Sequence, residues 1–476
     1  MRWPKKWIRR YRLMTHTYRP LFMTVGVCLV LLSGCISTPE RHGERIMDHV
    51  PEQWSTITDR TVERVTDGWV DTFHLPILTD MVREALNFNH DLKAAAARVE
   101  IARANVRIAG APRLPQINFS PDFRHGRFGT FDSDIANENY SFMEVVFNLS
   151  WELDIWGRIR ASQEAASLDA MAVETDLQGA ALSLAARTAQ AWFELIEAGL
   201  QETVASQSVA DRRMLVDLVR GRFNRGLTPG LDLGLALTDL ANAEAQLAEA
   251  HNQVQMTARR LEVLLGRYPA GELKAQLPFP ALPSTLTAGV PSELLNRRPD
   301  IAAAMERLRA EDQRFISANL ALLPRITLTG TGGTRSNSLK ELTQPGALAW
   351  NVGAGLLQPI FAGDQLQGEI ARNRAAVTEA MENFQQTALE AFREVEQALA
   401  AEERLSEQEH ALSEAVKHAQ ANQQMAVYAY RHGFTTILTL LDSFRGTLMA
   451  QSAHLTIKRR LLTNRIDLYL ALGGTV

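Results

Sequence analysis

Apolar and polar residues alternate with a period of two in four short stretches of the chain. These stretches lie at residues 116–124, 145–154, 325–331 and 350–356. The alternation predicts β-strands with one apolar and one polar face. An ordinary half-buried sheet would show the same pattern, but a tilted strand of about ten residues is also long enough to cross a bilayer.

The apolar residues outside these stretches follow the spacing of long helices. No proline interrupts residues 122–228, and none follows Pro359. A helix over residues 158–225 would be about 100 Å long at about 1.5 Å per residue. Ordinary globular helices are much shorter, so this length predicts a coiled coil or a helical barrel.

The order of these elements occurs twice along the chain. Phe223–Gly226 in the first half matches Tyr430–Gly433 in the second, and Phe193 in its helical pattern matches Phe392. We therefore expect a first repeat at residues 78–266, with its strands near 116–154, and a second repeat at residues 292–474, with its strands near 325–359. The proline-rich residues 267–291 between them are predicted to form a linker.

The N-terminal residues have the pattern of a secretory signal. Residues 1–34 hold seven basic residues and no acidic one, and an apolar run from Leu21 to Leu32 leads into Cys35. The run is too short to span a bilayer as a helix, so we expect residues 1–34 to be removed. The small residues before Cys35 resemble the lipobox of bacterial lipoproteins, in which this cysteine becomes an acylated N-terminus. Residues 35–77 would then be a lipidated segment, and Ile36 after the cysteine favours the outer membrane.

Charge and motif content exclude several classes of protein. The formal net charge of -4 becomes -11 once the seven basic residues of the signal are removed, so the chain lacks the basic surface of a nucleic-acid-binding protein. The sequence holds no zinc-spaced histidine pair, nucleophile elbow or phosphate-binding loop. We therefore expect no enzyme, no metal site, and no cofactor apart from the covalent lipid on Cys35. His432 is interpreted as a solvated polar residue.

A sheet of four strands is too small to close into a barrel by itself. Four strands cannot surround a lumen, and open sheet edges are not stable in lipid. A membrane-spanning sheet must therefore be shared among copies of the chain, and three copies would supply twelve strands. The predicted polar face ends in Glu152 and Asp154, from which we expect a preference for cations.

Six motifs resemble signatures of the TolC-like outer membrane efflux proteins, in the lipoprotein branch that includes NodT and OprM. The resemblance covers essentially the whole chain after the signal. The motifs are Trp151–Arg158, Val290–Leu295, Arg298–Ile301, Leu323–Leu328, Tyr430–Gly433 and Leu438–Asp442.

This resemblance implies an α+β fold and a homotrimer. Its twelve-stranded barrel, with four strands from each chain, would lie in outer membrane lipid and continue into a long periplasmic α-helical barrel. The implied function is that of the outer membrane channel in a tripartite efflux system. Within the family, the alternative is a duct for type I protein secretion or for metal-ion efflux. A periplasmic adaptor is the rival class, but adaptors carry one helical hairpin and no such double repeat.

The resemblance also implies roles for particular residues. The periplasmic tips, Gly226, Leu227 and Thr228 with Gly433, Phe434 and Thr435, would dock a membrane-fusion adaptor that connects the channel to an inner-membrane pump, most often of the RND type.

Asp442 matches a position where related proteins direct an aspartate toward the three-fold axis, as part of a gate. Three carboxylates on an axis repel each other, so such a gate needs clamping donors, for which Arg222, Arg225 and Arg431 are candidates. The alternative is that Asp442 is an ordinary solvated residue of the last helix.

Overall fold

The computed structural model describes residues 54–55, 68–127, 139–275, 277–283 and 291–474. All of them belong to one compact unit, residues 45–476. The predicted signal, Cys35 and most of the predicted lipidated segment lie outside the described residues.

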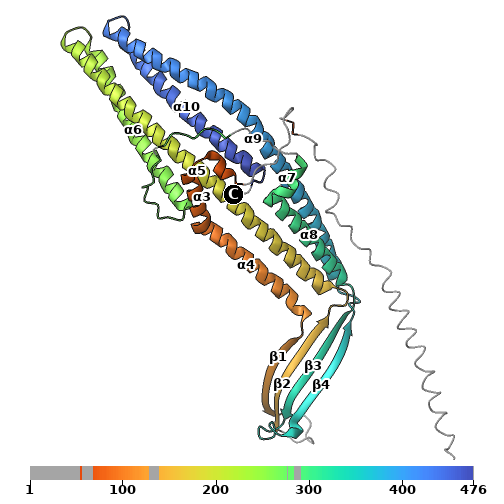
Figure 1. Ribbon diagram of the computed structural model, residues 1–476. Helices are drawn as coiled ribbons and strands as arrows, with labels where there is room; N and C mark the ends of the chain where they lie inside the picture. The colour runs from red at the N-terminus through yellow and green to blue at the C-terminus, as the bar shows by residue number, and fades with distance from the viewer. Residues whose placement is uncertain (1–53, 56–67, 128–138, 276, 284–290, 475–476) are drawn as a thin grey trace, which may run out of the picture. The chain divides into compact units, whose positions relative to one another are not determined.

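Two long antiparallel helical hairpins make up most of the described chain (Figure 1). Helix α5, Arg158–Asn224, turns into α6, Gly230–Leu264, and helix α9, Gln365–Arg431, turns into α10, Ile437–Ala471. Both α5 and α9 have 67 residues, and both α6 and α10 have 35. The equal lengths show that the two halves of the chain are built to one plan, and no proline interrupts any of the four.

Shorter helices lead into the strands of each half. In the first half these are α3, Pro76–Phe88, and α4, His90–Gly110, and in the second half α7, Pro291–Arg297, and α8, Pro299–Leu320. Helix α5 packs along α4, α6 and α8, while α9 packs along α8 and α10. None of the described helices is both long and apolar enough to cross a membrane.

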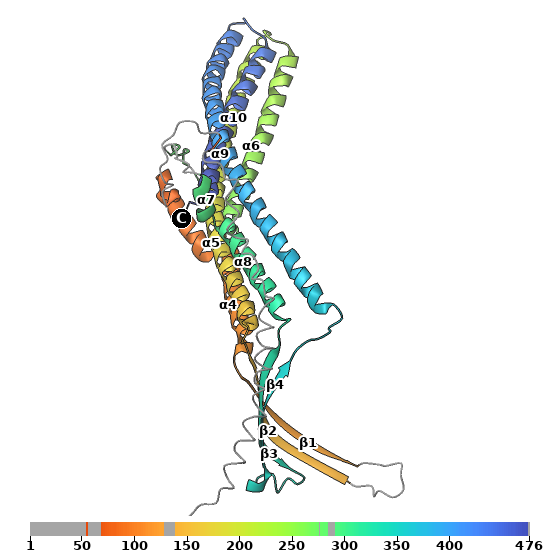
Figure 2. The ribbon, with the colours of Figure 1, turned by 90° about the vertical axis from the view of Figure 1, so that its right-hand side faces the viewer.

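The four strands form a single antiparallel sheet in the order β1-β2-β3-β4. The strands are β1, Gln116–Arg127, β2, Asn139–Leu153, β3, Arg325–Ser336, and β4, Leu348–Leu357. Each half of the chain thus supplies one hairpin. The sheet lies at one end of the helices, and the α5–α6 and α9–α10 turns lie at the other end (Figure 1, Figure 2).

Small side chains allow the long helices to approach closely. Alanine is the most frequent residue at the buried positions of α5, and the larger Trp192 and Phe193 pack in one apolar cluster with residues of α3 and α10. Phe193 and its counterpart in the second half, Phe392, each contact an aromatic ring from a residue that lies earlier in the chain. Phe73 lies 5.4 Å from Phe193, and Trp54 lies 6.1 Å from Phe392, between ring centroids.

A buried carboxylate holds the segment that follows α6. The Glu262 side chain accepts hydrogen bonds from the backbone N–H groups of Gly271, Glu272 and Leu273, at 2.7, 2.9 and 3.2 Å. Burial acts to raise the pKa of Glu262, but these three hydrogen bonds outweigh it and lower the pKa below its ordinary value. The charged carboxylate therefore fixes the start of the linker to the last turns of α6.

Candidate functional site

One face of the sheet is apolar across all four strands. The register aligns Phe119 with Phe147, Phe147 with Gly332, and Gly332 with Trp350. The Phe119 and Phe147 rings lie 5.2 Å apart. At the other edge of the sheet, Trp350 is 74 % exposed. A contiguous apolar patch of this kind is rare on the surface of a soluble monomer. It is what the lipid-facing side of a transmembrane sheet requires.

The opposite face of the sheet is mostly polar and is hydrogen-bonded across strands. Asn148 on β2 donates to the Ser120 hydroxyl on β1 at 3.1 Å, and the Thr331 hydroxyl on β3 donates to Asn148 Oδ1 at 3.2 Å. Val146 is a buried exception on this face. It lies opposite Gly333, where an added Cβ would come 2.1 Å from the Val145 carbonyl oxygen. The predicted division into an apolar and a polar face is therefore confirmed.

The two carboxylates expected to favour cations are both engaged within the chain. Glu152 accepts a hydrogen bond from Arg158 at 2.8 Å. Asp154 accepts from the backbone N–H groups of Ile159 and Arg160 at 2.9 and 2.8 Å, and so caps the start of α5. Glu152 is thus paired with a cation of its own chain and Asp154 is engaged at a helix start, and the preference for cations stays a prediction.

The two tip turns share one geometry. Gly226 and Gly433 adopt positive φ angles of 71° and 79°. The next residues close the turns, with Leu227 N–H bonded to the Arg222 carbonyl at 3.0 Å and Phe434 N–H bonded to the Ala429 carbonyl at 2.8 Å. This is the glycine-terminated helix end known as a Schellman motif.

Apolar side chains project from both tips. Leu227 is 59 % exposed and Phe434 is 78 % exposed. His432 is exposed, as the sequence suggested, but its ring also lies 4.2 Å from that of Tyr428 and 6.0 Å from that of Phe434. Thr228 donates to the Asp232 carboxylate, whereas the half-buried Thr435 directly precedes the cap of α10. The tips therefore offer small exposed surfaces of apolar and aromatic character.

Asp442 lies near the start of α10 with its side chain exposed, between the buried Leu441 and Ser443. No hydrogen bond or ion pair joins it to any other described residue. The candidate clamps do not reach it within the chain: Arg222 bonds carbonyl groups of α9, and Arg225 bonds the Gly221 carbonyl of its own helix at 2.9 Å. Its carboxylate is thus available to groups outside the described chain.

A buried ionic cluster close to Asp442 was missed by sequence reasoning. Asp239 on α6 accepts from Arg212 Nε on α5 at 2.9 Å and from Arg445 Nη2 on α10 at 2.9 Å. The side chains of Arg212 and Asp239 are each 4 % exposed. The cluster joins the α5–α6 hairpin to α10 three residues beyond Asp442. No motif marks it, because its members come from three helices in both halves of the chain.

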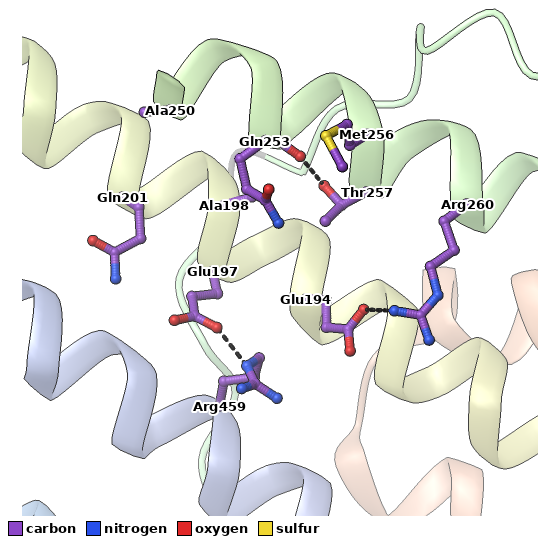
Figure 3. Close-up of a pocket in the computed structure, with 10 residues that line it drawn as sticks. All are labelled: Glu194, Glu197, Ala198, Gln201, Ala250, Gln253, Met256, Thr257, Arg260 and Arg459. Atoms are coloured by element: carbon purple, nitrogen blue, oxygen red, sulfur yellow. Dashed lines mark hydrogen bonds and ion pairs between the residues drawn. The ribbon is translucent and has the colours of Figure 1, made fainter. Parts of the chain in front are cut away.

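Figure 3 shows a pocket of about 390 Å³ between α5, α6 and α10. Its charged groups are paired, Glu194 with Arg260 at 2.8 Å and Glu197 with Arg459. The polar residues around it offer no nucleophile next to a base. Among the described residues no group of three metal-ligating side chains comes together. We interpret the pocket as part of the helix surface, with its charged side chains held in ion pairs.

Comparisons with known proteins agree on one family. The family model described as "Outer membrane efflux protein" matches residues 81–267 and 290–474. The pyoverdine export outer membrane protein OpmQ of Pseudomonas putida is 30 % identical over 89 % of this chain and 92 % of its own length. The cation efflux system protein CusC of Escherichia coli is 28 % identical over 94 % of this chain and 97 % of its own length. The solved structure of the outer-membrane channel OprN superposes with a TM-score of 0.83 at 28 % identity, covering 90 % of this chain and 98 % of that one.

Proposed function

The chain belongs to the outer membrane efflux protein family and acts as the outer membrane channel of a tripartite efflux system, and we propose how its parts carry out that work. The protein is a homotrimer in the outer membrane that extends into the periplasm, with an adaptor and an inner-membrane pump as partners. The finer assignments below concern this chain's own residues.

The observation that carries the proposal is the position of two different surfaces at opposite ends of the long helices. The apolar face of the sheet suits contact with lipid, and the exposed glycine turns suit contact with a protein (Figure 1). We propose that Gly226, Leu227 and Thr228 with Gly433, Phe434 and Thr435 form the surface that docks the adaptor. The pump is proposed to be of the RND type.

The name of OpmQ refers to pyoverdine and that of CusC to cations. One fold therefore serves chemically different cargoes in the relatives. This supports a duct that passes its cargo without a catalytic step, with selection residing in the pump. We propose that Cys35 carries the lipid that adds a second anchor to the barrel.

Asp442 is proposed as the gate residue. Its exposed carboxylate lies one residue from the buried Leu441 and near the periplasmic end of α10. In a trimer three such carboxylates around an axis would hold water and cations and narrow the passage when neighbouring donors clamp them.

Planar-bilayer recordings from purified trimers test the gate. Asp442→Ala should raise the single-channel conductance, because it removes the clamped ring. Thr439→Ala, one helical turn earlier, is the matched control and should leave the conductance unchanged. Equal conductance in wild type and Asp442→Ala, with trimers intact, would instead assign the closure to apolar packing at Leu438 and Leu441.

A further inference from the structure

One arginine crosses from the first tip to the second. Arg222 lies in the last turn of α5, and its Nη1 is 3.1 Å from the Arg431 carbonyl oxygen and 3.3 Å from the Tyr430 carbonyl oxygen. Its guanidinium carbon is 5.1 Å from the centre of the Tyr430 ring. The side chain therefore contacts the end of α9 through both hydrogen bonds and an aromatic face.

The end of α9 is a favourable place for a cation. The last carbonyl groups of a helix have no partners within the helix and carry partial negative charge, which a cation stabilises. Tyr430 is only 3 % exposed, and a cation over a desolvated ring is held more tightly than one at the surface. Arg222 Nε is buried without a hydrogen-bond partner. The hydrogen bonds of the guanidinium group therefore go to the carbonyl groups at the end of α9.

The contact has no counterpart in the opposite direction. The repeat that aligns Phe223–Gly226 with Tyr430–Gly433 places Ala429 at the position of Arg222. An alanine side chain has no donor to offer the end of α5. Each turn closes itself through its own glycine, and among the described residues of the two turns the charged side chain that crosses is Arg222 of the first half.

We infer that Arg222 is a positioning residue that joins the two tips of one chain into a single docking unit. Behind it, one apolar cluster already packs the four helices together near the tips, and includes Val219, Tyr430 and Leu440. Arg222 extends that packing to the turns themselves and fixes the second turn against the first. This inference rests on the proposed docking of an adaptor at the tips, and it adds that the adaptor binds the pair as one surface.

The contact of Arg222 with the end of α9 is called the Arg222 clip below. Hydrogen exchange of purified trimers tests this clip in the absence of an adaptor. The Gly433 N–H bonds the same Tyr430 carbonyl that Arg222 contacts, at 3.1 Å, and so reports directly on the clip. In Arg222→Gln, amides of residues 432–434 should exchange about tenfold faster, since a hydrogen bond to a charged group is lost. Arg222→Lys should fall between the two. Arg225→Gln is the matched control, because among the described residues the Arg225 side chain bonds the Gly221 carbonyl of its own helix and not the second tip. Equal exchange in wild type and Arg222→Gln would overturn the inference.

Site-specific photo-cross-linking to a purified membrane-fusion adaptor then tests docking. A photoreactive residue at Leu227 or at Phe434 should cross-link in the wild-type background, and the yield at Phe434 should fall severalfold in Arg222→Gln. An unchanged yield at Phe434, despite faster exchange of the second turn, would refute the positioning role. Absence of any cross-link at both tips in the wild-type background would refute the proposed docking surface, while hydrogen exchange would still decide on the clip.

Discussion

Removal of the Asp239 carboxylate should destabilise the helical region strongly. The Asp239 carboxylate compensates the charge of Arg212, whose side chain is 4 % exposed. It also forms an ion pair with Arg445, whose side chain is 57 % exposed. Loss of one partner from a buried ion pair costs about 3–5 kcal/mol, because the remaining charge stays buried without compensation. The exposed Arg445 can turn to water, so its share is only about 0–1 kcal/mol. We expect Asp239→Leu to lower the free energy of unfolding by about 3–5 kcal/mol, and Arg445→Gln by about 1 kcal/mol or less.

Guanidinium unfolding of detergent-solubilised trimers, followed by far-ultraviolet circular dichroism at one fixed protein concentration, measures both losses. The double variant Arg212→Met with Asp239→Leu is the decisive control. It removes both charges and should recover most of the lost stability, as an apolar replacement of a buried pair commonly does. A loss below about 1 kcal/mol in Asp239→Leu would refute the reasoning. So would a double variant as unstable as the sum of the single ones.

Three further predictions concern the lipid, the sheet and the linker. Labelled palmitate should enter the wild-type protein but not Cys35→Ser, and label retained in that variant would contradict the lipoprotein assignment. Phe147→Lys should destabilise the membrane-inserted trimer by about 2–4 kcal/mol in unfolding measurements, whereas Ser150→Lys on the polar face should cost little; equal damage would indicate a sheet buried on both faces. Glu262→Gln should speed tryptic cleavage at Lys274 about tenfold, because charge-assisted hydrogen bonds to the linker are lost. In the wild type the pKa of Glu262 is lowered, so its stabilisation is complete above the carboxyl's ordinary pKa and is lost as the pH falls through the lowered value; pepsin cleavage of the linker that stays constant through that acidic range would contradict it.

The features that the sequence predicted are those encoded locally. Alternation defines the faces of the strands, and glycines at Gly226 and Gly433 mark the tip turns, since only a residue without a Cβ adopts their backbone angles readily. The contacts that tie the two halves together were not predictable in this way. Arg222 contacts the end of α9, and Asp239 binds Arg445 of the other half in addition to Arg212 of its own half. No spacing in one sequence encodes such pairs.

The partners of Glu152 and Asp154 were not predictable from the strand pattern. Both carboxylates lie at the boundary between β2 and α5, where Arg158 binds Glu152 and the first N–H groups of α5 bind Asp154. The alternation of the strand correctly placed them on its polar side, but it carried no information on what lies beyond the strand's end. The pattern therefore could not reveal that Asp154 caps the start of α5.

The pairing of β2 with β3 also determines when the sheet can form. Strand β2 ends at Leu153 and its partner β3 begins at Arg325, with the whole α5–α6 hairpin between them. The β1–β2 hairpin can therefore form before β3 pairs with it, because pairing across such a long separation in the sequence is slow. Until then the edge of β2 is unpaired and the face bearing Phe119 and Phe147 has no lipid beside it, so the hairpin is prone to aggregate. We expect the newly exported chain to require a periplasmic holding chaperone until β3 has paired with β2.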